Sequence, residues 1–197
     1  MGRPDASACR IARLPAVPAT PDHPALQRVI DAAARKGVAI DVVTFDESTH
    51  TAAEAARAVG AELGQIVKSL VFVAGQSDDL EPIVCLVSGG NRVDLARLAA
   101  VCGLPDIRRA TAREANDLTG FVIGGIPPIG HPRRLRVVMD PDLGRFAEVW
   151  AAAGLPTAVF AVSPATLRML ADATVAPIAE DAPGAPIAPP HPATTTG

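Results

Sequence analysis

Two apolar runs separated by a short polar stretch constrain the fold of this 197-residue chain more than any other feature. Residues 66–73 and 82–87 are dense in valine, isoleucine and leucine, and the stretch between them carries glycine, serine and two aspartates. Short runs of β-branched residues on either side of a polar turn are typical of paired strands. We therefore expect two adjacent antiparallel strands at the centre of a sheet.

Helical patterns alternate with further short strands along the rest of the chain. Thr51 and Glu54 fit a capping box that opens a helix, and so do Thr111 and Glu114. Helices mixed with antiparallel strands, without a regular β-α-β alternation, favour the α+β class. The expected helices cover residues 23–36, 51–59, 93–102, 111–118 and 163–170; the expected strands cover residues 38–43, 135–139 and 157–161 and a short stretch near residue 174; residues 148–153 fit a strand, although residues 146–153 fit a helix equally well.

Composition indicates one globular domain with a tail at each end. Hydrophobic residues make up 49% of the chain, which is enough for a sizeable core at this length. Residues 1–20 contain several prolines among small residues, and residues 181–197 are mostly proline, alanine and threonine. We expect the domain to cover residues 21–180 and both end segments to be disordered.

Charge and aromatic content restrict the kinds of partner. A formal net charge of −3 gives no broad positive field for a DNA duplex. Five Phe, one Trp and no Tyr do not supply the stacked platforms of many single-strand binders, so any nucleic acid must be held locally. The three cysteines lack C-x-x-C spacing, and no apolar run is long enough for a membrane span or a signal core. We expect a cytoplasmic protein without a membrane partner.

Common catalytic motifs are missing, and a single lysine is the first candidate. The sequence has no G-x-x-x-x-G-K-[ST], no G-x-S-x-G and no H-E-x-x-H motif. Lys68 interrupts an apolar strand, and a buried ammonium is costly unless it is paired or functional. A lysine that faces a cavity could hold a phosphate. Alternatively, strand alternation puts Lys68 on the solvent face and Ser69 on the opposite face.

A loop rich in glycine and proline is the second candidate. Residues 120–132 contain four glycines and three prolines, a composition that excludes an ordinary helix or central strand. Such a loop could recognise an ester through its main chain, or it could be a rigid connection between two sheet edges. His131 at its end could carry a proton, donate a hydrogen bond or simply lie on the surface, and His50 has the same ambiguity.

Four motifs follow one another along the chain: Thr51-Ala-Ala-Glu-Ala-Ala, Gln65-Ile-Val-Lys-Ser-Leu-Val-Phe, Arg92-Val-Asp-Leu-Ala-Arg-Leu and Gly124-Gly-Ile-Pro-Pro-Ile-Gly-His. In this order they resemble the YbaK family, which includes freestanding ProX proteins and the editing domain inserted in bacterial prolyl-tRNA synthetases. The similarity covers about residues 24–176, and the fourth motif, together with residues 146–154, looks closer to the ProX-like proteins.

The resemblance implies an α+β domain on a single mixed, mainly antiparallel pseudo-barrel sheet flanked by helices. It implies that the protein acts in trans on the acceptor end of mischarged tRNA(Pro), in transient contact with prolyl-tRNA synthetase and without metal or cofactor. Lys68 would hold the terminal adenosine, the loop would position the ester and its water, and a ribose hydroxyl would assist. The implied catalytic residues are Lys68, Gly124, Gly125 and Pro128, and the implied substrate-binding residues are His50, Asn91, Asp94, Ile126, Gly130 and His131.

Two alternatives stay open at this point. The chain could be a module that binds tRNA or a synthetase without catalysis, and Ile129 and His131 are where its loop departs from the family pattern. It could also hydrolyse another aminoacyl ester or a nucleotide. The amino acid removed could be alanine, 2-aminobutyrate, cysteine, serine or threonine, because small hydrophobic pockets separate neighbours that differ by one methylene by only ~1–3 kcal/mol.

Overall fold

The computed structural model describes residues 23–45, 51–75 and 80–181. The segments expected to be tails, except residue 181, lie outside these residues, and so does His50. Within the described residues the strands form two sheets, which we call the larger and the smaller sheet. None of the described helices is long and apolar enough to cross a membrane.

The larger sheet is built on the expected central pair of strands. β2 (Val67–Ala74) and β3 (Glu81–Ser88) pair in antiparallel fashion along their whole length. β4 (Arg108–Arg109) pairs with the other edge of β2, whereas β5 (Arg136–Met139) runs parallel to β3 and β8 (Thr174–Val175) runs parallel to β5. The order β4-β2-β3-β5-β8 confirms that the two long apolar runs lie inside the sheet.

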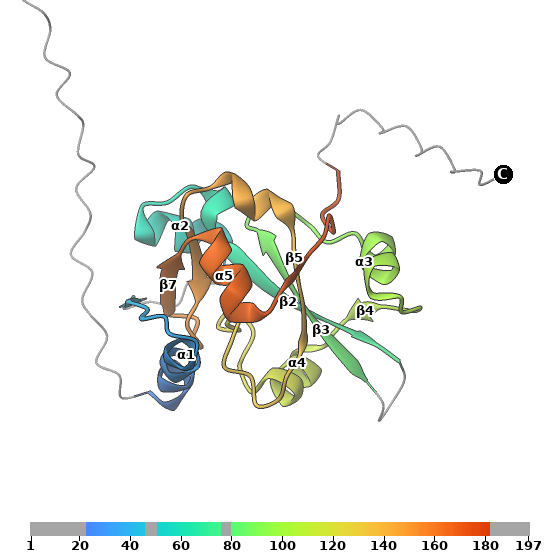
Figure 1. Ribbon diagram of the computed structural model, residues 1–197, viewed down its shortest axis with the longest axis horizontal. Coiled ribbons are helices and arrows are strands. Elements are labelled where there is room, and N and C mark those ends of the chain that lie inside the picture. The colour runs from blue at the N-terminus through green and yellow to red at the C-terminus, as the bar shows by residue number, and fades with distance from the viewer. Residues whose placement is uncertain (1–22, 46–50, 76–79, 182–197) are drawn as a thin grey trace, which may run out of the picture.

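The smaller sheet packs beside the larger one (Figure 1). It has the order β1-β7-β6, with β1 (Val42–Thr44), β7 (Ala158–Val162) and β6 (Val149–Ala152) paired in antiparallel fashion. The α+β class and the mainly antiparallel pairing are confirmed, but the strands divide between two sheets instead of forming one continuous sheet. β3 takes one edge of β2 and β4 pairs with Phe72 and Val73 on the other, and in the part of the chain that the structure describes the two sheets are joined by one bridge, between Ile66 and Trp150.

The ambiguous segment before β7 is a strand. Val149 and Ala151 are buried while Trp150 and Ala152 are partly exposed, which is a period of two. This alternation suits a strand with one face toward a core and does not suit a helix, whose buried residues recur every three to four positions.

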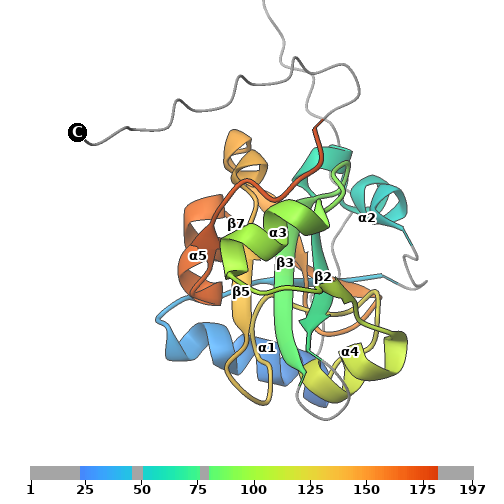
Figure 2. The ribbon, with the colours of Figure 1, turned by 90° about the vertical axis from the view of Figure 1, so that its right-hand side faces the viewer.

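The helices lie around the two sheets and begin where their caps predict. Thr51 Oγ1 accepts a hydrogen bond from Glu54 N (3.2 Å) and Thr51 N donates to the Glu54 carboxylate (3.2 Å), and Thr111 and Glu114 form the same reciprocal pair. Figure 2 shows α3 lying across the face of β3 and β5. The helices are α1 (Pro24–Arg35), α2 (Ala52–Val59), α3 (Leu95–Cys102), α4 (Ala112–Thr119) and α5 (Pro164–Ala171), with 3-10 turns η1 (Leu63–Gln65) and η2 (Pro141–Arg145).

The strands of the larger sheet bury side chains on both faces. On β3, Val84 and Leu86 join the core cluster that includes Phe160 of the smaller sheet, whereas Ile83 and Cys85 join the cluster under α3. All five side chains are fully buried. The space between the two sheets is therefore an aliphatic core. One face of β2 turns toward this core, with Val67 and Val71.

A buried carboxylate fastens the end of the described chain to β5. Asp140 follows β5 and is 2% exposed. Its side chain accepts hydrogen bonds from the backbone N–H groups of Asp142 (3.0 Å), Ile178 (3.0 Å) and Ala179 (2.8 Å). Arg97 of α3 adds a bond to the Ala179 carbonyl oxygen (2.7 Å). Charge-assisted bonds of this kind are stronger than neutral ones, so the segment is firmly held.

The glycine- and proline-rich segment forms neither helix nor strand, as its composition predicts. Gly124 has φ +90° and Gly130 has φ +84°, a region that side chains rarely adopt. At Gly125 a Cβ atom would lie 2.6 Å from the carbonyl carbon of Leu155, so only glycine permits this close approach to the β6–β7 turn. The segment is thereby fixed against the smaller sheet.

Candidate functional site

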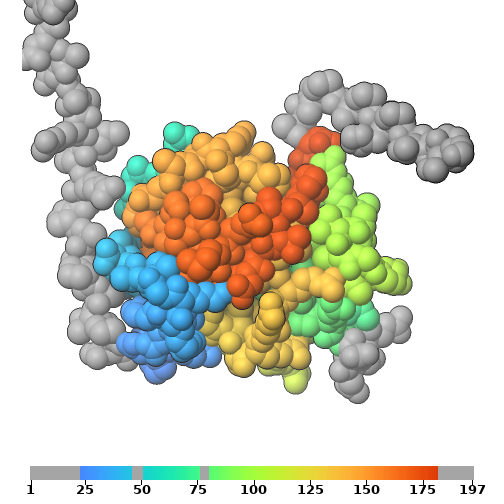
Figure 3. All heavy atoms as spheres, viewed as in Figure 1, coloured from blue at the N-terminus to red at the C-terminus, as the bar shows by residue number. Residues whose placement is uncertain are grey.

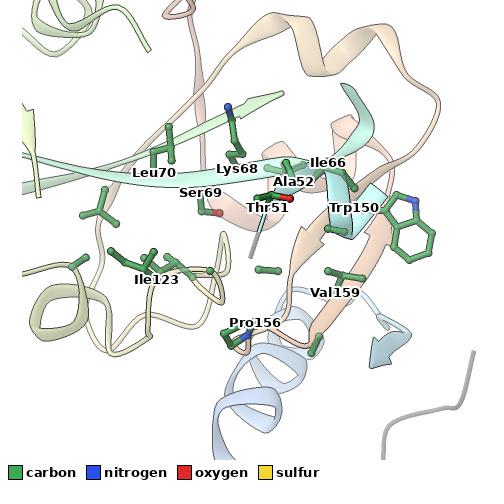
Figure 4. A pocket seen from close by; sticks show the side chains of 18 of the residues that line it. Thr51, Ala52, Ile66, Lys68, Ser69, Leu70, Ile123, Trp150, Pro156 and Val159 are labelled. Atoms are coloured by element: carbon green, nitrogen blue, oxygen red, sulfur yellow. The ribbon is translucent and has the colours of Figure 1, made fainter. Parts of the chain in front are cut away.

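A cavity of about 210 Å³ opens between the two sheets. Its walls come from β2, the start of α2, residues 123–126, and the strands β6 and β7 with the turn between them (Figure 4). Most of the lining is small and aliphatic, which suits a small apolar group. The residues that line it include Thr51, Ala52, Ala55, Ile66, Lys68, Ser69, Val71, Arg109, Ala110, Ala115, Ile123, Gly124, Ile126, Trp150, Ala152, Pro156, Ala158 and Val159.

Lys68 and Ser69 point to opposite sides of β2 (Figure 4). The Ser69 hydroxyl turns toward the cavity, on the same strand face as Val67 and Val71, which belong to the core between the sheets. The Lys68 ammonium lies on the other side, where it donates a hydrogen bond to the Asn91 carbonyl oxygen. Lys68 thus lies at the edge of the cavity, and the Ser69 side chain faces its interior.

Lys68 lies in a cluster of positive charge. Burial lowers the pKa of Lys68, and the nearby charges of Arg109 and Arg92 lower it further. None of these three side chains forms an ion pair with a carboxylate in the part of the chain that the structure describes. Three cations without a counter-ion favour an anion, and a phosphate group beside Lys68 would relieve their mutual repulsion.

Asn91 is held so that its carbonyl group faces Lys68. Its side-chain amide donates a hydrogen bond to Asp142 Oδ2 (2.8 Å), and its backbone N–H donates to the Ser88 carbonyl oxygen (2.9 Å). Asp94 has a different place: its carboxylate caps α3 by accepting bonds from Ala96 N (2.8 Å) and Arg97 N (3.1 Å). Among these residues, Asn91 contacts the positive cluster, whereas the Asp94 carboxylate is occupied by the helix.

The loop motif divides between the cavity and a second hollow. Gly124 and Ile126 line the cavity, and Gly125 packs against the Leu155 backbone directly behind it. Pro128, Gly130 and His131 line a separate groove beside α1 and α5. The structure therefore brings the first half of the motif to the cavity and turns the second half away from it.

His131 is held in an apolar environment. Its ring nitrogens are buried, and the ring meets Phe121 edge-on with centroids 5.9 Å apart. Burial lowers the pKa of His131 to about 4; the Arg28 charge lowers it further, while the Thr119 backbone acts in the opposite direction. The Arg28 guanidinium stacks over the Phe121 ring, 4.1 Å from the ring centre. At neutral pH His131 is therefore uncharged.

Several residues of the cavity escaped prediction from the sequence. Ser69, Arg109, Trp150 and Pro156 all line it. Only Ser69 had a signal in the sequence, because strand alternation places it with the buried valines at positions 67 and 71. No group of three or more His, Cys, Asp or Glu side chains within reach of one metal ion occurs among the described residues.

Comparison with protein families identifies the kind of domain that carries this cavity. The family model of the aminoacyl-tRNA editing domain matches residues 46–170. This chain belongs to the aminoacyl-tRNA editing domain family. Every residue that lines the cavity lies inside the matched segment. The resemblance to YbaK-like proteins that the four motifs indicated is confirmed.

Relatives of this editing domain include freestanding and inserted forms. A multifunctional Ser/Thr-tRNA deacylase, ProXp-y of Escherichia coli (strain K12), is 32% identical over 130 residues, which are 66% of this chain and 77% of that protein. A proline–tRNA ligase of Limosilactobacillus fermentum is 30% identical over 95 residues, which are 48% of this chain but only 17% of the ligase. A solved structure of a candidate trans-editing enzyme for prolyl-tRNA synthetase has a TM-score of 0.74 and 46% identity, covering 81% of this chain and 99% of that one.

Proposed function

We propose that this editing domain hydrolyses, in trans, the ester of tRNA(Pro) that carries a small non-cognate amino acid. The observation that carries the proposal is the cavity: small aliphatic walls with an unneutralised cluster of cations at one edge. The aliphatic space suits the aminoacyl group, and the cations suit a phosphate of the terminal nucleotide. The ProXp-y relative and the ligase, with their names as deacylase and proline–tRNA ligase, support the same substrate class.

Positioning accounts for catalysis without a catalytic triad. Lys68, supported by Arg109, would hold the terminal nucleotide, while Gly124 and Ile126 would bring the loop backbone against the ester. A water oxygen attacks the ester carbonyl carbon, the bond from that carbon to the ribose oxygen breaks, and the ribose oxygen takes up a proton. A neighbouring ribose hydroxyl of the substrate assists that transfer. Holding the reactants in place in this way can supply a large part of the rate enhancement.

The test uses tRNA(Pro) charged separately with alanine, 2-aminobutyrate, cysteine, serine, threonine and proline. We expect rapid loss of one or more of the non-cognate esters and no loss of the prolyl ester. Lys68→Ala should lower kcat/KM by roughly 100-fold, as expected when a charge that positions the substrate is removed. Arg113→Ala is the matched control, because Arg113 lies on α4 with its side chain 92% exposed and lines neither hollow.

Either of two results would contradict the proposal. If no ester is hydrolysed while uncharged tRNA still binds, the chain is a binding module of the same fold. If hydrolysis proceeds but uncharged tRNA does not compete, the enzyme acts on some other aminoacyl ester. Equal activity of Lys68→Ala and wild type would show that Lys68 does not contribute to hydrolysis.

A further inference from the structure

The Ser69 hydroxyl is buried without a hydrogen-bond partner among the described residues. Two buried hydroxyls on neighbouring elements are satisfied: Ser88 Oγ on β3 donates to the Gly64 carbonyl oxygen (2.8 Å), and Thr119 Oγ1 on α4 donates to the Ala115 carbonyl oxygen (2.6 Å). An unpaired buried hydroxyl opposes folding, because it has lost its hydration without a replacement. Alanine or valine would be better for the core at this position, so the fold alone does not account for a serine.

The surroundings of Ser69 define the group that would satisfy it. Its hydroxyl turns toward the cavity (Figure 4), whose other walls include Ala110, Ala152, Ala158 and Val159. An ammonium group placed there would lose its hydration among methyl groups, and one hydroxyl could not compensate for that loss. A neutral hydroxyl on a small side chain can exchange one hydrogen bond with Ser69 and place its carbon atoms against the aliphatic wall.

We propose that Ser69 is a specificity-determining residue that hydrogen-bonds the side-chain hydroxyl of a seryl or threonyl group. The proposal rests on the proposed function, because it assumes that an aminoacyl ester occupies the cavity. With an alanyl or 2-aminobutyryl ester the Ser69 hydroxyl stays unpaired. A site built around such a bond discriminates against the analogue that lacks the hydroxyl.

Two pairs of esters whose members differ by one hydroxyl test this inference. Serine differs from alanine by one hydroxyl, and threonine differs from 2-aminobutyrate in the same way. For the wild type we expect kcat/KM to be roughly 10- to 100-fold higher for the hydroxyl member of each pair. Ser69→Ala should bring the two members of each pair to within about threefold of each other by lowering kcat/KM for the seryl and threonyl esters. Ser163→Ala, which changes a serine at the N-cap of α5, is the control for removing a hydroxyl elsewhere.

The result that overturns the inference is equal treatment of the esters. The wild type could show no preference for the hydroxyl members, or Ser69→Ala could be slower on all four esters by the same factor. Either result would show that Ser69 does not recognise the aminoacyl side chain. Binding of stable amide analogues, adenosine carrying 3′-linked serine or alanine, is measured in parallel by calorimetry. If no ester is hydrolysed, the proposed function fails, and the ratio of the two dissociation constants in wild type and Ser69→Ala still decides the inference.

The groove beside α1 and α5 carries a second, independent inference. It has a volume of about 510 Å³, and its lining includes five basic side chains and one acidic side chain among the described residues. Figure 3 shows the segments that build it meeting on one face: α1 in blue, the loop after α4 in yellow, and α5 with β8 in orange to red. The charged residues of the groove are Arg35, Lys36, Arg133, Arg134, Arg136 and Asp172.

Most of this positive charge is not neutralised. Asp172 pairs with Lys36 (2.7 Å), and Arg136 pairs with Glu81 outside the groove (3.0 Å). Arg35, Arg133 and Arg134 form no ion pair in the part of the chain that the structure describes. A local excess of arginine on a chain with a net charge of −3 indicates an anionic partner at this face.

We infer that the groove binds the phosphate backbone of the tRNA whose aminoacyl end lies in the cavity; this too rests on the proposed function. The loop joins the two places, since Gly124 and Ile126 line the cavity and Arg133 and Arg134 line the groove. Seven residues of chain, from Ile126 to Arg133, reach at most ~25 Å. Apart from His131, no aromatic side chain among the described residues lines the groove, so it suits phosphates and not stacked bases.

A comparison of long and short substrates tests the groove. Arg133→Glu combined with Arg134→Glu should lower kcat/KM on the full aminoacyl-tRNA by roughly tenfold or more. It should leave hydrolysis of an aminoacylated CCA trinucleotide unchanged, and it should flatten the salt dependence of tRNA binding by about one unit of log–log slope per arginine. Arg113→Glu controls for reversing the charge of an exposed arginine that lines neither hollow. Equal effects on both substrates, or no effect on either, would overturn the inference, and filter binding of uncharged tRNA decides it if no ester is hydrolysed.

Discussion

Acidification should destabilise this protein through His131 before its carboxylates titrate. The unfolded side chain titrates near pH 6.5, whereas burial lowers the pKa in the folded state to about 4. Between these values the unfolded chain binds a proton that the folded chain does not bind. The contribution of His131 to the free energy of unfolding is therefore fully present above about pH 6.5, and it is lost as the pH is lowered to about 4. At 1.36 kcal/mol per pH unit, the window corresponds to a loss of about 3 kcal/mol.

Urea denaturation at half-unit steps between pH 7.5 and pH 4 measures this loss directly. His131→Leu removes the titrating group and keeps an apolar side chain against Phe121, so its free energy of unfolding should vary much less across the same window. His23→Leu, at the exposed N-cap of α1, controls for replacing a histidine by leucine elsewhere in the chain. Parallel curves for wild type and His131→Leu between pH 6.5 and pH 4 would refute the argument from burial.

Three further predictions follow from other parts of the structure. Gly125→Ala should destabilise the fold by about 1–3 kcal/mol and slow deacylation, because its Cβ would meet the Leu155 backbone; Gly144→Ala, which meets open space, should do neither in thermal melts and ester assays. Asp140→Asn should lower the free energy of unfolding in urea by about 1–3 kcal/mol, since an amide cannot accept all three N–H bonds. The bond from Arg108 lowers the pKa of Glu114 to about 2, so the stability it contributes should be lost as the pH falls from about 4.5 through 2, and Glu114→Gln should lack that part of acid denaturation.

Local chemistry explains which parts of the fold could be predicted from the sequence. The capping boxes at Thr51 and Thr111 involve residues three positions apart, so their effect does not depend on the rest of the chain. The central hairpin was also predictable, because two long apolar runs can bury both faces only inside a sheet. The division into two sheets was not, since it depends on how segments far apart in the chain meet, as Ile66 and Trp150 do.

The candidate site, too, could be predicted only in part from local sequence patterns. Strand alternation separated Lys68 from Ser69, but it could not say which face meets a cavity, because that depends on where the smaller sheet packs. The loop motif is continuous along the chain, yet Gly124 and Ile126 line the cavity whereas the residues from Pro128 onward line the groove beside α1 and α5. Such a path is set by contacts between distant segments, and a sequence pattern does not contain it.

The carboxylate that fastens the last described segment to β5 has a consequence for synthesis on the ribosome. Asp140 can accept bonds from the N–H groups of Ile178 and Ala179 only after those residues have been made, and β8 joins the larger sheet only a few residues before them. A nascent chain that has been made as far as α5 therefore lacks these bonds and leaves one edge of β5 unpaired. The domain can close only after about residue 180 has left the exit tunnel, and until then it should be exposed to aggregation and proteolysis.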